Sequence, residues 1–274
     1  TCPTQPPPLR PGSPDGRRTE LKVVSTVLGV DMANPHDVLS INAASAALMI
    51  SGIPFEGPIG SVRVAYTTEG EWIPHPTYDE GEASTFELVV AGRELDNGDV
   101  AIMMVEAGGT EQSFYFYEDG APKVDEVALA EGLDASKQWI KESIALQRQL
   151  VASVIATSGP IEELPFTPVL DYTPEVFAAV EGCVHGEVSA AVAIAGKAER
   201  NAATDEATAK ALEALCGEDG EFAGQEKAVK EAVRSLTKKL VRRRIVDEGL
   251  RIDGRGVRDL RPVSAEVGVL PTAH

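Results

Sequence analysis

The sequence predicts an α+β region followed by an all-helical one. Before residue 110, short β-branched runs are separated by turn signals and by one helix pattern. From Val124 onward, apolar residues recur at helical spacing almost to residue 248. The chain has 274 residues, a length that suggests roughly two domains. The change of period near residue 124 therefore separates two kinds of architecture.

The mixed region is expected to begin with a strand and a helix. Residues 20–30 alternate and are rich in β-branched side chains, which predicts a strand. Asn34 and Pro35 are typical of a helix start, and the small apolar residues after them predict a helix to about Ser51. Gly52 fits a left-handed cap, so the helix is expected to end there.

Three more strands are predicted, at residues 61–66, 86–91 and 100–106. The segment 96–99, Asp-Asn-Gly-Asp, links the last two strands and is typical of a β-hairpin turn. Together with the preceding helix, these strands predict an α+β layer in which the helix covers one face of the sheet.

The helical region is expected to open with one long amphipathic helix. Apolar residues from Val127 to Leu150 keep helical spacing, and Gly159-Pro160 predicts the helix end. After a Pro-containing connector, further helices are expected, with breaks at Gly182 and at residues 216–220. They span residues 174–182, 185–196, 204–215 and 222–248. Residues 250–274 have another pattern, which indicates the opening of a further unit.

Composition limits the classes of function. A net charge of −18 argues against nucleic-acid binding by the surface as a whole, because Lys and Arg neutralise phosphates. Five basic residues near the end of the last helix are candidate RNA contacts, but the acidic surroundings favour a solvated helix end. They are Lys238, Lys239, Arg242, Arg243 and Arg244. No apolar stretch approaches the ~20 residues that span a bilayer, and three separated cysteines favour a reduced, cytoplasmic setting.

Two segments are candidate sites by residue type. The segment 41–64, INAASAALMISGIPFEGPIGSVRV, lines either a site or a core, and its small apolar residues favour core packing. Asp79, Glu80, Glu82 and Glu87 form an acidic cluster, which suits Mg²⁺ but more often is a solvated loop. The histidines are isolated in sequence: His36, His75, His185 and His274. No phosphate-binding glycine motif is present, so the residues alone do not give a reaction.

Three segments together carry a family resemblance. They are INAASAALMISGIPFEGPIGSVRV, ELVVAGRELDNGDVAIMMVEA and RIDGRGVRDLRPVSAEVGVLPTAH. In type and order they resemble bacterial polynucleotide phosphorylase (polyribonucleotide nucleotidyltransferase), over residues 20–274. The acidic, Ala-rich composition favours an actinobacterial-type member, a group also linked with guanosine pentaphosphate synthesis.

The resemblance implies a fold and domain limits. The fold is an RNase PH-like core (ribosomal protein S5 domain 2-like, with βαβ layers) followed by an all-α helical linker domain. Residues 1–158 would form the rear part of the first core, including its long C-terminal helix. Residues 159–249 would form the linker domain, and residues 250–274 the start of a second core.

The resemblance also implies an activity and partners. Single-stranded RNA is degraded from its 3′ end by inorganic phosphate to nucleoside diphosphates, and the reverse reaction polymerises them. Mg²⁺ assists, bound by residues outside this chain. The implied partners are RNA, two further copies in a cytoplasmic homotrimer and RNA degradosome components, with no membrane. KH and OB-fold domains that follow in the family supply much of the RNA grip, which reconciles the net charge of −18 with an RNA substrate.

Site residues are carried over one position at a time. The phosphate-binding loop of the family's second core corresponds here to residues 42–45, Asn-Ala-Ala-Ser, in the style of the first core. The two metal-binding aspartates fall on Glu87 and Gly81, so Glu87 is expected to be a relic position and no metal is expected there. His274 matches a histidine that lines the phosphorolytic site and is the expected catalytic residue. The serines and aspartates of that site lie beyond residue 274, so this segment is expected to be inactive alone and mainly structural and RNA-channel-forming.

The amino terminus departs from the family pattern. Pro3 and Pro7 stand where the family has channel-facing arginines, and only Arg10 is carried over, as an RNA contact. The altered block between intact flanks is consistent with a local frame slip.

Two alternatives to a polynucleotide phosphorylase are considered. One is a single-core RNase PH or exosome-like subunit, which the helical stretch argues against. The other is a non-catalytic RNA-binding or scaffold ring subunit.

Overall fold

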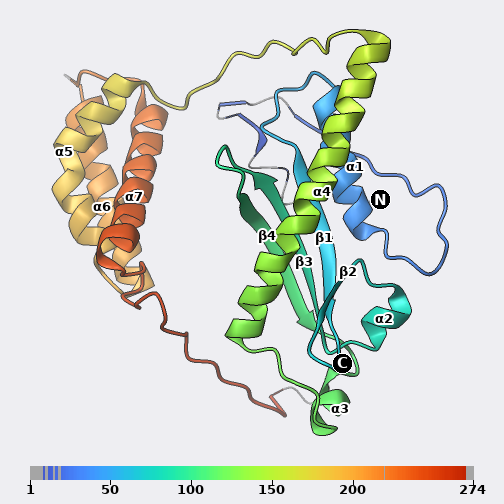
Figure 1. Ribbon diagram of the computed structural model, residues 1–274. Helices are drawn as coiled ribbons and strands as arrows, with labels where there is room; N and C mark the ends of the chain where they lie inside the picture. The colour runs from blue at the N-terminus through green and yellow to red at the C-terminus, as the bar shows by residue number, and fades with distance from the viewer. Residues whose placement is uncertain (1–8, 10–11, 15, 18–19, 219, 270–274) are drawn as a thin grey trace. The chain divides into compact units, whose positions relative to one another are not determined.

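Figure 1 shows a computed structural model of the chain, which describes residues 9, 12–14, 16–17, 20–218 and 220–269. The chain forms two compact units, Thr1–Pro168 and Val169–His274. The first combines a sheet with helices, and the second is helical. The predicted α+β class with a helical part after it is confirmed. In the described residues, no helix is long and apolar enough to cross a membrane.

The first unit is built on an antiparallel sheet with the strand order β2-β1-β3-β4. Its strands are β1 (Ile59–Tyr66), β2 (Trp72–Pro74), β3 (Phe86–Glu94) and β4 (Val100–Gly109). The three predicted strands after the helix are confirmed, each somewhat longer than expected. Gly98, at φ +77°, sits in the predicted hairpin turn between β3 and β4. β2 was not predicted, because three residues are too few to show an alternation.

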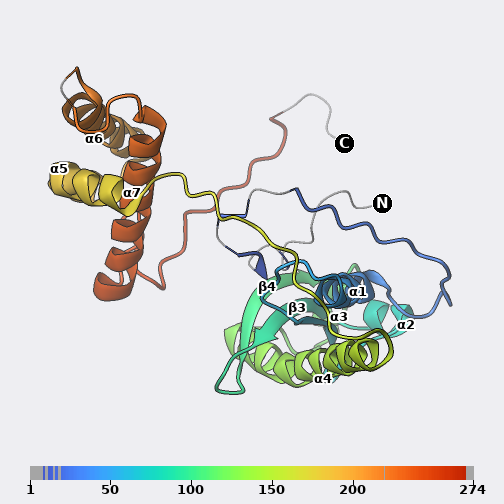
Figure 2. The ribbon, with the colours of Figure 1, turned by 90° about the horizontal axis from the view of Figure 1, so that it is seen from above.

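Two helices pack side by side against β1 (Figure 2), α1 (Asp37–Ile50) and α4 (Glu126–Ser158). The long helix α4 was predicted, and its Ile140 and Ile144 are fully buried in one core with the apolar face of β1 and β3. Gly60 allows the close approach, because a Cβ there would lie 2.5 Å from the carbonyl oxygen of Ile140. Burial of each Ile stabilises the fold by about 1.5–3 kcal/mol.

The segment before α1 differs from its prediction. The strand predicted at residues 20–30 is wrong, because these residues pair with no neighbouring strand and Leu28 is 95% exposed. Asn34 does not cap the helix: its backbone N–H donates to Asp31, 2.9 Å away, and α1 begins at Asp37. Alternation predicts an extended backbone, but a strand also needs the main chain of a neighbour. The left-handed Gly52 that ends the helix region is confirmed, with φ +73°.

The second unit is a bundle of three helices in the described residues, α5 (Pro174–Val192), α6 (Lys197–Cys216) and α7 (Glu226–Glu248). On α5, a Val recurs at every fourth position from Val176 to Val192, and each is at most 3% exposed. The break predicted at Gly182 is wrong, since α5 runs straight through it with open space where a Cβ would be. The break after Cys216 is confirmed.

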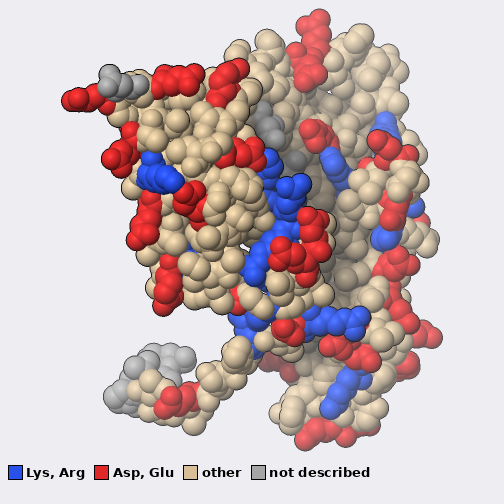
Figure 3. All heavy atoms as spheres, turned by 90° about the vertical axis from the view of Figure 1, so that its left-hand side faces the viewer, with Lys and Arg blue, Asp and Glu red and all other residues tan. Residues whose placement is uncertain are grey.

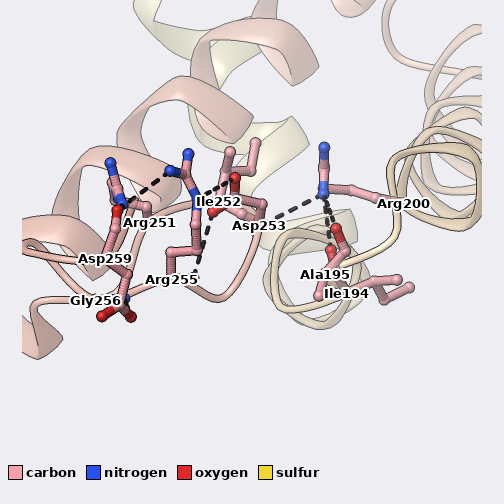
Figure 4. A network of polar contacts seen from close by, with 9 residues as sticks. All are labelled: Ile194, Ala195, Arg200, Arg251, Ile252, Asp253, Arg255, Gly256 and Asp259. Atoms are coloured by element: carbon pink, nitrogen blue, oxygen red, sulfur yellow. Dashed lines mark hydrogen bonds and ion pairs between the residues drawn. The ribbon is translucent and has the colours of Figure 1, made fainter. Parts of the chain in front are cut away.

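The segment after α7 folds back onto this bundle (Figure 4). Arg200 Nη1 donates to the carbonyl oxygens of Ile194 and Ala195, at 2.9 and 3.0 Å, and to that of Ile252, at 3.3 Å. Arg255 Nε donates to Asp253 at 2.8 Å, which closes the tight turn. Arg200 thus links this segment to the helical bundle through the Ile252 carbonyl.

Candidate functional site

Arg63 on β1 is the centre of the polar cluster in the first unit. Its Nη1 donates to Glu87 on β3 at 2.8 Å, and its Nη2 is hydrogen-bonded to Asp37 at the start of α1. Partial burial by itself lowers the pKa of this guanidinium, but the hydrogen bond and charge of Asp37 and the charge of Glu87 raise it above its ordinary value. Arg63 is therefore a fixed cation between two carboxylates.

Two small pockets meet at Arg63, and Pro35 also lines both. The larger, of about 290 Å³, is further lined by Gly81, Glu82 and Glu87. The smaller, of about 170 Å³, contains Asn42 and His75. The structure thus brings together the acidic cluster and the start of the small-residue helix, which lie more than 30 residues apart in sequence.

The acidic cluster does not fit a metal ion. Glu80 caps the short helix α2 (Tyr78–Glu82) in a reciprocal pair with Thr77, whose hydrogen bonds hold the pKa of this carboxyl below its ordinary value. Glu87 is paired with Arg63, and a Cβ on Gly81 would lie 2.8 Å from its Oε1. Among the described residues, no three His, Cys, Asp or Glu side chains are placed to hold a metal.

The polar residues of the segment 42–45 serve the open edge of β1, where β2 does not reach. Asn42 accepts from the Ser61 N–H at 2.8 Å and donates to the Ser61 carbonyl at 3.0 Å, as a paired strand would. Ser45, fully buried, accepts from the Ile59 N–H at 2.9 Å, and Gln147 of α4 donates to the Ile59 carbonyl at 2.8 Å. These side chains replace a strand neighbour and are not free to hold phosphate.

The five basic residues near the end of α7 divide into two groups. Lys239 pairs with Glu181 at 2.6 Å, and its hydrogen bond lowers the pKa of that carboxyl. Arg243 and Arg244 pair with acids one turn later on α7, at 3.6 and 3.4 Å. Lys238 and Arg242 are exposed and have no ion-pair partner in the part of the chain that the structure describes. The solvated helix end predicted from sequence therefore describes Lys238 and Arg242, whereas the other three basic residues are in ion pairs.

Two of the predicted site residues are not among the residues that the structure describes. His274 and Arg10 lie outside the described residues. His36 precedes the first turn of α1, and His185 lies on α5 in the other unit. Arg63 is not among the site residues predicted from the sequence. Its signal was a single charge within the apolar strand sequence IGSVRVAY, which in a half-buried strand requires a partner.

Comparison with known proteins gives two findings. Residues 175–256 match the family model described as "Polyribonucleotide nucleotidyltransferase, RNA binding domain". Over 97% of its length, the chain is similar to proteins named polyribonucleotide nucleotidyltransferase: 48% identical to those of Acidothermus cellulolyticus and Thermobifida fusca and 46% to that of Nocardia farcinica. The chain spans about a third of these relatives, 33–35% of their length. The resemblance inferred from the three motifs, to actinobacterial-type relatives, is confirmed.

Proposed function

We propose that this chain is part of a phosphorolytic 3′-to-5′ exoribonuclease. It aligns with about one third of the length of its relatives, which are named polyribonucleotide nucleotidyltransferases. The observation that carries the proposal is an identity of 45–48% to these relatives over 97% of the chain, a share that includes both units. In the proposed reaction, inorganic phosphate attacks the 3′-terminal phosphodiester of single-stranded RNA and releases a nucleoside diphosphate. The reverse reaction polymerises diphosphates.

Within this enzyme, the chain contributes structure and an RNA path. Residues 1–158 form the rear of a first RNase PH-like core, residues 159–249 a helical linker, and residues 250–274 the start of a second core. His274 belongs to the phosphorolytic site, and Arg10 contacts RNA. Magnesium, which stabilises charge on the transferred phosphoryl group, is held by residues outside this chain.

The polar cluster at Arg63 supports a structural role for the first unit. Glu87 is a relic of a metal position whose negative charge is neutralised by Arg63 at 2.8 Å. Asn42 and Ser45 are occupied by the main chain of β1, at 2.8 and 2.9 Å. A phosphate would have to displace these bonds, so this core contributes scaffold rather than chemistry.

The assembly is a cytoplasmic homotrimer, with RNA degradosome components as further partners and guanosine pentaphosphate synthesis as a further activity. RNA as a partner is supported by the RNA-binding domain model that residues 175–256 match. A second candidate function is a non-catalytic RNA-binding ring subunit, which is favoured by the internal pairing of Glu87 with Arg63 and of Asn42 with Ser61.

An exchange experiment separates the two functions. The matched third of the Acidothermus cellulolyticus relative is replaced by this chain, and the chimera is given poly(A) and inorganic phosphate. We expect phosphate-dependent release of ADP, retained when Glu87→Gln is introduced. A folded chimera that binds poly(A) but releases no ADP would support the non-catalytic subunit. A loss caused by Glu87→Gln alone would contradict the relic position.

A further inference from the structure

The helix α7 has two opposite faces. Val229, Val233, Leu236 and Leu240 are at most 8% exposed and pack in the core of the bundle. The opposite face carries exposed basic residues at spacings of three and four, which we call the basic face of α7. They are Lys227, Lys230, Arg234, Lys238 and Arg242. Since residues at these spacings lie one above another on a helix, the basic face is continuous.

The cations of this face are poorly neutralised by the protein. Lys227, Lys230, Lys238 and Arg242 have no ion-pair partner within the described ranges. Arg234 has one distant contact, 3.8 Å to Glu231, and its side chain is 83% exposed. An exposed contact of this length contributes well under about 1 kcal/mol. These charges are therefore available to a ligand.

The charge around this face is opposite to that of the chain. The helix α7 itself contains eight Lys and Arg residues and four Asp and Glu residues, so it is net positive, while the whole chain has a net charge of −18. The space-filling view shows a band of Lys and Arg side chains beside a surface where Asp and Glu are frequent (Figure 3). The acidic remainder disfavours polyanion binding elsewhere, so attraction is concentrated here.

The chemistry of the face suits phosphates rather than bases. From Lys227 to Arg242 the helix rises about 22 Å, at ~1.5 Å per residue. No aromatic, Asn or Gln side chain is present on α7, so neither stacking nor amide recognition of base edges is available. What remains is a row of point charges, which binds a phosphate backbone without selecting its sequence.

We propose that the basic face of α7 binds the backbone of single-stranded RNA by phosphate contacts alone. The proposal rests on the proposed function, which supplies RNA as the substrate. It assigns the contact to four or five exposed cations on one helix, and it excludes the paired Lys239, Arg243 and Arg244. Binding is then strongly dependent on salt and nearly independent of base identity.

The test measures binding of fluorescently labelled poly(A) and poly(U) to the full 274-residue chain between low and physiological salt. The variant Arg234→Gln/Lys238→Gln removes two charges from the basic face. The matched control Lys197→Gln/Lys210→Gln removes two from α6. At about 0.1 M salt, each single-strand phosphate contact contributes a factor of about 5, so the α7 variant should bind about 25-fold more weakly and the control almost unchanged.

The salt dependence gives an independent readout. Replacing Lys227, Arg234, Lys238 and Arg242 together by Gln should reduce the slope of log affinity against log salt by about 3. An unchanged slope, equal losses in the α7 and α6 variants, or a strong preference between poly(A) and poly(U) would overturn the proposal. Circular dichroism is the control that checks whether each variant is folded.

The two proposals fail separately. If the exchange chimera releases ADP but its α7 variants bind RNA as tightly as the parent, the basic face is not the RNA contact and the proposed function stands. If the chimera releases no ADP while the α7 variants lose RNA affinity, the phosphate contacts stand and the enzymatic function fails.

Discussion

Arg63 in the first unit lies between two carboxylates, whereas Lys238 and Arg242 in the second unit have no partner in the described residues. Asn42 and Ser45 in the first unit are likewise bonded to the main chain of β1. The first unit therefore uses its polar side chains to hold its own fold. The second unit also has internal polar contacts, such as the pair of Lys239 with Glu181, but they leave the cations on one face of α7 unpaired in the described residues.

This difference follows from the two architectures. A sheet with an uncovered edge leaves main-chain groups that side chains must satisfy, as Asn42 and Ser45 do. A helix satisfies its own main chain, so the exposed side chains of α7 are not needed for folding. A polar residue near a predicted site is consequently weaker evidence of ligand binding in the first unit than in the second.

The largest effect is expected in the apolar core of the second unit. Leu236→Ala removes a fully buried side chain and should lower the free energy of unfolding of this unit by about 3 kcal/mol. The control Lys238→Ala, two residues away on the exposed face, should cost less than about 0.5 kcal/mol. Hydrogen exchange of peptides from α5 to α7 measures both. Equal costs would mean that the two faces of α7 are not distinct.

In the first unit, Asn42→Ala should destabilise by about 2 kcal/mol, because it leaves the N–H and C=O of Ser61 without partners. Asn34→Ala, which removes one exposed side-chain hydrogen bond to Asp31, is the control and should cost less than about 0.5 kcal/mol. Hydrogen exchange of β1 peptides, measured at increasing urea concentration, gives the free energy of unfolding of each variant. A harmless Asn42→Ala would free this side chain for ligand binding and erase the contrast between the units.

Arg63→Met should cost about 1–2 kcal/mol, because Glu87, whose side chain is only 30% exposed, loses its counter-charge. Arg93→Met is the matched control: its pair with Glu56, 3.3 Å long, is more exposed and should contribute less than about 0.5 kcal/mol. Urea midpoints of the two variants give the comparison. Similar midpoints would show that the Arg63 pairs act as ordinary surface pairs.

The smallest effect concerns an exposed carboxylate. Hydrogen bonds from the backbone and side chain of Asn34 and the backbone of Ala33 lower the pKa of Asp31 to about 2. Because the folded pKa lies below the unfolded value of 3.8, the ionised Asp31 carboxylate stabilises the folded state above pH 3.8. This stabilisation is lost as the pH falls toward 2. Carboxyl NMR titration should give a pKa near 2, and Asn34→Ala should raise it. A pKa near 3.8 in the parent would show that the turn does not persist in solution.

Much of the fold could be predicted because it is encoded locally. The spacing of apolar residues gave the long helix α4, and the Asp-Asn-Gly-Asp turn gave the β3–β4 hairpin. Residues 20–30 were assigned to a strand wrongly, since their alternation says nothing about which neighbour pairs with them. Gly182 was assigned to a helix break wrongly, because the burial of the Val stripe on both sides outweighs the low helix propensity of one glycine.

The candidate sites were predicted less completely. The family resemblance predicts that Glu87 and Gly81 stand at a relic metal position, which stays a prediction. The structure brings these two residues together, and only the structure shows Arg63 as the cation beside Glu87. The sequence also predicted the basic residues at 238–244 as one cluster, whereas the structure divides them into residues with and without an ion-pair partner among the described residues.

The sequence by itself determined the family resemblance, the order of a mixed and a helical region, and the net charge of −18. These follow from residue types and short-range periodicity. Only the tertiary structure decided that Asn42 pairs with the edge of β1 and that Arg63 neutralises Glu87. Each of these contacts joins residues 19 or more positions apart, and partners at that separation are chosen by packing.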